Sequence, residues 1–262
     1  MSVCNGEKCN SRLRGERDMH EILTVKNLYK DNILKDISFS IKSGEMVAVM
    51  GPSGSGKSTL LYQVSGMERA DMGEVWVDGT QICDLSEDAR ARLRLERMGF
   101  VFQQMNMLKN LNLIDNITLP ADAARRRKNG KKEVERKGLQ LMENMGIADL
   151  AYRRTHEVSG GQLQRACICR SLINDPKILF ADEPTGALNR SAAKEVMEEF
   201  VRLNREGATI LLVTHDSKVA AACSRILYLL DGMIEGELLL TDMTETKARE
   251  DAVSKWLAQM GW

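Results

Sequence analysis

The chain has 262 residues, of which 43% are hydrophobic and 28% charged, a composition typical of a soluble globular protein with a substantial core. Lysine and arginine total 37, as do aspartate and glutamate, so no net charge favours nucleic acid or an anionic bilayer as a partner. No uninterrupted apolar run approaches the ~20 residues that span a bilayer, and the polar N-terminus is unlike a secretion signal. One large α/β domain or two smaller ones would fit this length.

Residues 1–18 show neither helical nor strand periodicity, which predicts a flexible tail. Met19 stands directly before the first structured run and is therefore a candidate start of translation. From residue 22 to residue 41 the sequence predicts short strands separated by turn residues.

Paired CxxC spacing, which would indicate zinc, is absent from the sequence. Reduced, mostly structural thiols are the favoured interpretation, with a binding role left open for the first two cysteines. The six are Cys4, Cys9, Cys83, Cys167, Cys169 and Cys223.

An apolar run at 46–50 is followed by GPSGSGKST, which fits the phosphate-binding pattern G-x-x-x-x-G-K-[ST]. Its glycines let the backbone turn several amides toward one anion, and the following helix adds its positive N-terminal end. The ammonium of Lys57 can reach the β- and γ-phosphates, and the hydroxyl of Ser58 can ligate Mg²⁺. An ordinary turn is the alternative, but the strand before it and the helix-forming run from Thr59 favour a nucleotide-binding loop. The loop residues are Gly51, Pro52, Ser53, Gly54, Ser55, Gly56, Lys57, Ser58 and Thr59.

The elements after this loop are a strand at 73–79, a charged helix at about 86–97 with Ser86 as its cap, and a strand at 98–102. Residues 104–158 are first rich in methionine and then helical and highly charged, which we interpret as an inserted helical subdomain. The basic block of 125–128 with Lys131 and Lys132 is typical of a solvated helix end and loop.

The α/β pattern then resumes with a helix at about 160–173, a strand at 177–181, a helix near 191–204 and a strand at 208–213. A hairpin around Asp231 and Gly232 and a helix at about 244–260 complete the chain. The chain shows no internal repeat.

The apolar strand after residue 177 ends in two carboxylates, Asp182 and Glu183. At the carboxyl end of a strand, Asp182 can hold the water shell of Mg²⁺ while Glu183 orients and polarises an attacking water. Apolar runs that end in an acid are common in proteins for purely structural reasons. The phosphate-binding loop in the same chain favours the functional interpretation.

A second helix opens with Ser159, Gly160, Gly161 and Gln162. Ser159 is a good N-cap, and two glycines beyond a cap suggest that another group approaches the backbone closely. A second phosphate contact at a helix N-terminus is the physical candidate. Taken alone, this segment would be read as an ordinary loop leading into a helix.

The motifs GPSGSGKST, VFQQ, VSGGQ, ILFADEP and LLVTHD, in this order, resemble those of the ATP-binding cassette (ABC) ATPases over about residues 20–240. The resemblance implies an α/β P-loop fold with a mixed, mainly parallel sheet, an N-terminal antiparallel β-subdomain and an inserted α-helical subdomain. It assigns 19–240 to the ATPase domain and 241–262 to a C-terminal helix. It also implies a head-to-tail homodimer that holds two ATP molecules with Mg²⁺, each between the phosphate loop of one subunit and the Ser159/Gly161 segment of the other.

The resemblance further implies roles for single residues. Gln103 would contact Mg²⁺ and the attacking water and relay to a membrane subunit, and His215 would contact the γ-phosphate. Tyr29 is the candidate for stacking on adenine, although an aromatic residue in a strand is usually part of the core. Asn189 stands where most members of the family have an aspartate, so coupling between the two ATP sites could differ.

Three sequence segments look most like the subfamily of antimicrobial-peptide resistance, lipoprotein release and macrolide export. They are MGFVFQQMNML, ADEPTGALN and VTHDSKVAAACSRILYLLDGMI. Asn189 looks nearest to the bacitracin-type branch. The implied partner is a transmembrane permease on a separate chain, with the ATPase at the cytoplasmic face of the cell membrane, and Met105, Met107 and Leu108 are candidate docking residues. Two alternatives stay open: a regulatory cassette that signals without transport, and a soluble cassette outside transport.

Overall fold

The computed structural model describes residues 20–124 and 130–262. The predicted tail at 1–18, the candidate start Met19, Cys4, Cys9 and the basic residues 125–128 lie outside the described residues.

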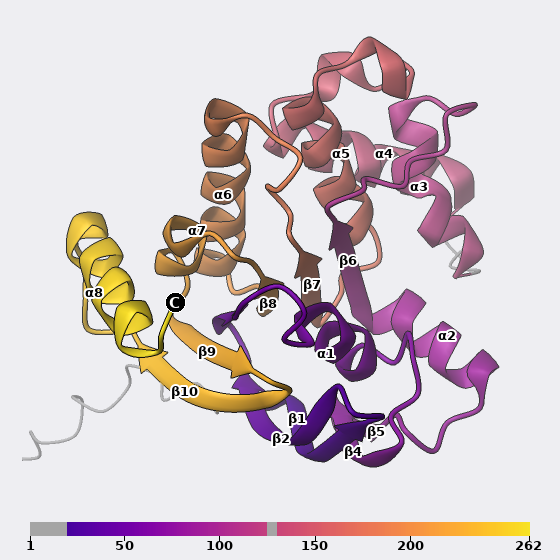
Figure 1. The fold of residues 1–262 in the computed structure, drawn as a ribbon. Coiled ribbons are helices and arrows are strands. Elements are labelled where there is room, and N and C mark those ends of the chain that lie inside the picture. The colour runs from indigo at the N-terminus through magenta and orange to yellow at the C-terminus, as the bar shows by residue number, and fades with distance from the viewer. Residues whose placement is uncertain (1–19, 125–129) are drawn as a thin grey trace, which may run out of the picture.

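Strands and helices follow one another in nearly the order that the sequence predicts (Figure 1). The strands are β1 Glu21–Lys30, β2 Leu34–Lys42, β3 Met46–Met50, β4 Met72–Val77, β5 Thr80–Gln81, β6 Met98–Phe102, β7 Ile178–Asp182, β8 Ile210–Val213, β9 Arg225–Leu230 and β10 Met233–Leu239. The helices are α1 Lys57–Val64, α2 Glu87–Arg97, α3 Leu113–Ala123, α4 Gly130–Asn144, α5 Gly160–Leu172, α6 Arg190–Arg205, α7 Ser217–Ala221 and α8 Thr246–Gln259.

The described strands form two sheets. An antiparallel sheet has the order β2-β1-β4-β5, and a larger sheet has the order β10-β9-β3-β8-β7-β6. In the larger sheet all neighbouring strands are parallel except the β9–β10 hairpin. This arrangement confirms the predicted fold class, a mainly parallel sheet joined to an N-terminal antiparallel one.

The larger sheet separates two hydrophobic cores. Along β3, Met46, Ala48 and Met50 face one core, whereas Val47 and Val49 face the other. Because both faces are covered, the strand is apolar at every position rather than at every second one. The first core also contains buried residues of α3, α5, α6, α7 and α8, and the second contains those of α1 and of the antiparallel sheet.

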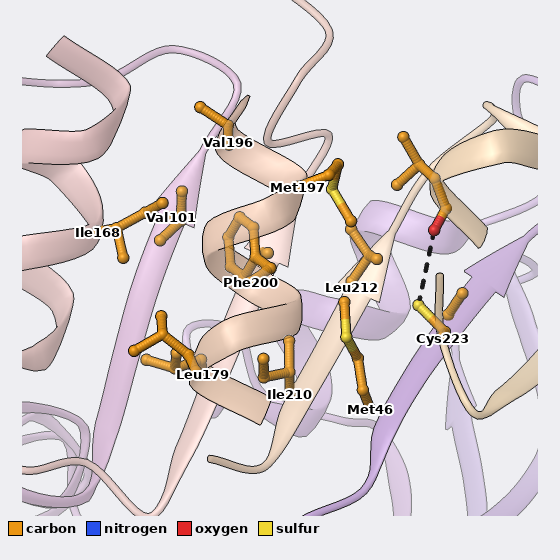
Figure 2. Close-up of a cluster of buried hydrophobic side chains, with 14 of the residues drawn as sticks. Met46, Val101, Ile168, Leu179, Val196, Met197, Phe200, Ile210, Leu212 and Cys223 are labelled. Carbon is orange, nitrogen blue, oxygen red and sulfur yellow. Dashed lines mark hydrogen bonds between the residues drawn. The ribbon is translucent and has the colours of Figure 1, made fainter. Parts of the chain in front are cut away.

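Figure 2 shows the first core, where Phe200 of α6 lies among aliphatic side chains of the sheet and is 1% exposed. At its edge the thiol of Cys223 donates to the carbonyl oxygen of Val219. Burial raises the pKa of Cys223 to about 12 and that of Cys167 to about 11. These thiols therefore pack as small apolar groups and stay protonated at neutral pH.

Helices α3 and α4 with the turns at Ala148–Leu150 and Thr155–Glu157 occupy the stretch that we interpret as a helical subdomain. Asn116 of α3 is 1% exposed, and its amide holds the preceding loop by accepting from the backbone N–H of Leu108 and donating to nearby carbonyls. A Cβ at Gly138 would lie 2.6 Å from Cδ1 of Ile114, so α3 and α4 approach closely here.

The structure departs from the sequence prediction mainly at the ends of elements. Helix α1 begins at Lys57 rather than at Thr59, and β8 begins at Ile210 rather than at 208. The sequence analysis missed α7, which has only five residues and is capped by Asp216 through the N–H of Lys218. A pattern of period 3.6 cannot be recognised over so short a run.

The C-terminal helix α8 packs on the end of the larger sheet through its buried residues Val253 and Leu257. The ring of Trp256 makes a T-shaped contact with that of Tyr228. Arg249 donates to carbonyl oxygens of Ala221, Cys223, Leu240 and Met243. Within the described part of the chain, no helix combines the length and the apolar character needed to cross a bilayer.

Candidate nucleotide-binding site

The predicted site residues converge because the parallel strands of the larger sheet end in one row. Phe102 of β6 lies opposite Asp182 of β7, Asp182 opposite Val213 of β8, and Val213 opposite Val49 of β3. The residues that follow these positions therefore share one edge of the sheet, as in other open α/β folds that bind ligands at this edge. They include the phosphate loop, Gln103, Glu183 and His215.

The phosphate loop between β3 and α1 has a shape that requires glycine. Gly51 has φ +155°, and a Cβ there would lie 2.0 Å from the carbonyl oxygen of Leu229 in β9. Helix α1 begins at Lys57 without a side-chain cap. Because the first amides of a helix have no partner within the helix, those of Lys57, Ser58 and Thr59 point free N–H groups toward the loop. This cradle fits a phosphate group.

The ammonium of Lys57 lies at the loop and donates to the carbonyl oxygens of Gly51 and Pro52, both at 2.8 Å. Burial lowers the pKa of Lys57, while the nearby carboxylates of Glu183 and Asp182 act in the opposite direction. A partly desolvated cation next to free amides is a strong attractor for the terminal phosphates of a nucleotide.

Asp182 ends β7 and faces the first turns of α1. The hydroxyls of Ser58 and Tyr62 donate to its two carboxylate oxygens, each at 3.2 Å. Burial raises the pKa of Asp182 above its ordinary value, and the two hydrogen bonds and the charge of Lys57 oppose this shift. The oxygens of Ser58 and Asp182 are hard ligands of the kind that Mg²⁺ prefers, so the residues present fit this metal.

Glu183 follows directly and adopts a left-handed backbone conformation with φ +47°, which is uncommon for a residue with a side chain. Its Oε1 lies 2.8 Å from Nδ1 of His215, from the segment after β8. The Glu183 side chain is 17% exposed and that of His215 is 67% exposed. A carboxylate held in this way can accept a proton from a water molecule on its open side.

Gln103 is exposed and follows β6. A Cβ at Gly186 would lie 2.9 Å from its Nε2, so the side chain of Gln103 lies over the loop that follows Glu183. The structure therefore brings Gln103 to the same edge as the two carboxylates.

The Ser159 segment is an open helix N-terminus. The hydroxyl of Ser159 accepts from the N–H of Gln162, whose side-chain oxygen accepts in turn from the N–H of Ser159. This capping box leaves the amides of Gly160 and Gly161 without a partner inside the helix. Ser159 and Gly160 are exposed. A Cβ at Gly161 would lie 2.9 Å from that of Ala192, so this glycine also lets α5 approach α6.

A protein-family model described as ABC transporter matches residues 34–186, more than half of the chain. The chain belongs to this family. It is therefore an ATP-binding cassette with ATP-hydrolysing activity, as the phosphate loop and the paired carboxylates predict.

Relatives of similar length cover nearly the whole cassette. This chain is 42% identical over 226 residues to the ABC transporter ATP-binding protein YxdL of Bacillus subtilis. The match covers 84% of this chain and 87% of that protein. The chain is 37% identical over 246 residues to the lipoprotein-releasing system ATP-binding protein LolD 1 of Chlorobium chlorochromatii, which covers 94% and 98%.

A longer relative, the macrolide export ATP-binding/permease protein MacB of Bdellovibrio bacteriovorus, is 38% identical over 232 residues. The match covers 87% of this chain but 35% of MacB, so the cassette spans about a third of that protein. Among solved structures, the cassette MJ0796, dimeric and bound to ADP and Pi, has a TM-score of 0.76 and 36% identity, covering 83% of this chain and 98% of that one.

The phosphate loop and the Ser159 segment lead into helices that pack on opposite faces of the larger sheet. Helix α1, which follows the phosphate loop, packs into the second core, whereas α5, which follows Ser159, packs into the first. In the described residues, no hydrogen bond joins the Ser159 segment to the phosphate loop. One cassette thus carries two separate open helix N-termini, one at Lys57 and one at Ser159.

The role of Tyr29 stays a prediction. Tyr29 is half-buried in β1, opposite Met72 of β4. The nearest side chains to Gly56 of the phosphate loop are Leu34 and Ile33, which belong to the turn after β1 and the start of β2.

Sequence reasoning missed Tyr62, whose hydroxyl contacts the same carboxylate as Ser58. A signal was present, since residues four apart on a helix share one face. Tyr62 lies four positions after Ser58 and would have been expected to face β7 once α1 was placed there.

Proposed function

We propose that this cassette is the ATP-hydrolysing subunit of an ABC transporter, coupled to a transmembrane permease on a separate chain at the cytoplasmic face of the cell membrane. Two copies would associate head to tail around two ATP molecules with Mg²⁺. The observation that carries the proposal is the presence of two open helix N-termini, at Lys57 and at Ser159, whose helices pack on opposite faces of one sheet. If both bind phosphate, each can complete the pocket of another copy.

In this proposal the phosphate loop and Lys57 bind the β- and γ-phosphates of ATP from one side. Ser58, Asp182 and Gln103 would hold Mg²⁺, which when bound neutralises charge that develops on the phosphate oxygens. From the second copy, the hydroxyl of Ser159 and the amides of Gly160 and Gly161, of which Gly160 is exposed, would face the γ-phosphate.

Glu183 would act as the general base. Its carboxylate accepts the proton of the attacking water, and His215 holds that carboxylate through the 2.8 Å contact with Nδ1. The exposed side of the His215 ring is free to contact the γ-phosphate.

A separate permease is supported by the relatives. LolD 1, of nearly the same length as this chain, is called the ATP-binding protein of a releasing system, while MacB joins ATP-binding and permease functions in its name. Leu108 is 47% exposed and lies with the half-buried Met105 and Met107 before α3, as an apolar docking surface requires.

The bacitracin-type branch remains part of the proposal. Asn189, the residue that suggests it, caps α6 by accepting from the N–H of Ala192 at 3.0 Å. An aspartate would make the same cap with an added charge, so the substitution preserves the start of the helix and alters only the electrostatics.

The test is to co-express the cassette with a candidate transmembrane permease from the same organism, purify both together and measure ATP turnover in lipid. We expect co-purification, turnover that the permease raises above the basal rate of the cassette alone, and loss of turnover in Lys57→Ala. The transporter assignment would be contradicted if the cassette does not co-purify with the permease and hydrolyses ATP at its full rate alone in solution.

A further inference from the structure

Gln164 joins α5 to the ends of two strands of the catalytic edge. Its side chain is buried, with the residue 1% exposed. Nε2 donates to the carbonyl oxygen of Pro184 at 2.8 Å and to that of Phe102 at 3.4 Å. Pro184 follows Glu183 and Phe102 precedes Gln103, so a single amide group spans the backbones that carry both residues.

The two bonds hold backbone where regular pairing ends. Strand β7 ends at Asp182 and β6 at Phe102, so the carbonyl of Pro184 lies beyond the β-ladder. Glu183 adopts φ +47°, a conformation that persists only where the surroundings enforce it. One buried amide bonded to both backbones therefore limits how far the carboxylate of Glu183 can move relative to Gln103.

The amide oxygen of Gln164 has no hydrogen-bond partner in the described residues. The residue thus contributes its N–H donors rather than a balanced polar network. An apolar side chain of the same length would fill the same space and remove only these two bonds.

We infer that Gln164 is a positioning residue that sets Glu183 and Gln103 relative to α5. Gln164 lies five residues after Ser159, the N-cap of α5, or about 7.5 Å along the helix axis. A shift of the Ser159 end would therefore move the catalytic edge with it. The positioning of Glu183 stands on the geometry alone; the link to a nucleotide bound by a second copy rests on the proposed function.

The experiment compares two buried amides in the purified full chain. Gln164→Met removes both donors at constant length, and Gln164→Asn keeps the amide but shortens it by about 1.5 Å, out of reach of both carbonyls. Asn116→Leu is the matched control, because Asn116 is equally buried at 1% exposed but bonds only within the stretch from Leu108 to Asn112 and α3.

We expect both Gln164 variants to lower kcat by roughly 10- to 100-fold, the effect of misplacing a catalytic group by about an ångström. Their KM and their affinity for ADP should stay within about twofold, since the phosphate loop is untouched. Asn116→Leu should lower the melting temperature about as much as the Gln164 variants do. It should keep kcat within about twofold of the parent.

Two results would overturn the inference: an unchanged kcat in either Gln164 variant, or parallel losses of kcat in Asn116→Leu. The parent chain separates the two proposals. If the parent hydrolyses ATP and the Gln164 variants match it, the positioning role fails while the proposed function stands. If the Gln164 variants lose turnover but the parent does not dimerise with ATP, the positioning role stands while the proposed function fails.

Discussion

His215 and Glu183 lie 32 positions apart in the chain, yet Nδ1 of the imidazole is 2.8 Å from Oε1 of the carboxylate. The pair forms because β7 and β8 are parallel neighbours and both residues follow the ends of their strands. The histidine is largely exposed and the glutamate largely covered, so the imidazole closes one side of the carboxylate and leaves another side open.

His215→Ala should therefore reduce ATP turnover by about 100-fold or more, since the carboxylate loses its orienting partner. ADP affinity should not change, because ADP lacks the γ-phosphate. The melting temperature should also stay close to that of the parent, as for most exposed substitutions. His20→Ala, which removes an exposed imidazole 3.6 Å from Asp78, is the control and should leave turnover intact.

The charged carboxylate of Asp182 should lower the free energy of unfolding of the nucleotide-free protein at neutral pH. Burial raises its pKa in the folded state, so its contribution favours folding below about pH 4, the ordinary range of aspartate, and is lost as pH rises through the raised value. Asp182→Asn removes the charge and keeps one of the two oxygens that accept from Ser58 and Tyr62. It should melt above the parent at pH 7, and the difference should shrink toward pH 4.

The same variant should lose Mg²⁺-dependent turnover, which separates the stability of the site from its activity. Thermal melts without nucleotide across this pH range, with ATPase assays at neutral pH, make the measurement. A melting temperature below that of the parent at every pH would show that the carboxylate is stabilising and that the sign is wrong.

Gly51→Ala should destabilise the fold and remove nucleotide binding, because its Cβ would lie 2.0 Å from the carbonyl oxygen of Leu229. We expect a loss of about 1–3 kcal/mol for the strained backbone, with more from the clash. The control is Gly79→Ala. Gly79 also has a positive φ, +75°, but open space where a Cβ would lie, so this substitution should cost about 1 kcal/mol. Equal losses in the two variants, by urea unfolding, would count against the close approach of the loop to β9.

Arg249→Leu should loosen α8, because it removes a donor from four carbonyl groups around α7 and the end of β10. Within the described part of the chain, only that of Leu240 keeps another donor, the N–H of Met243. Leaving buried acceptors unpaired costs about 1–3 kcal/mol. Fluorescence should report the change, since Trp256 packs on Tyr228 with ring centroids 6.1 Å apart. Lys255→Leu, at an exposed position of the same helix, should have no such effect.

Much of this architecture could be predicted from local patterns. The apolar run before GPSGSGKST predicted β3, the loop and α1, and Ser86 and Ser159 cap α2 and α5 as expected. Parallel strands ending at one edge explained why distant motifs meet. These features depend on short stretches of sequence, where turn and capping chemistry decide the conformation.

The features that could not be predicted depend on the register between distant elements. Gln164 bonds to backbone 62 and 20 positions away, and nothing in its neighbours marks it as different from Gln162. Tyr62 reaches a carboxylate 120 positions later. Side-chain bonds to backbone carbonyls carry no sequence signature in their partner, because every residue has a carbonyl group.

The most direct measurement of the central claim is the mass of Glu183→Gln by sedimentation with and without ATP. This variant keeps every phosphate contact but lacks the base, so bound ATP should persist and convert the chain from monomer to dimer. Adding Ser159→Arg should leave nucleotide binding intact and block the conversion. If Glu183→Gln binds ATP at saturation and still sediments as a monomer, the two phosphate-binding elements do not meet across copies and the account is wrong.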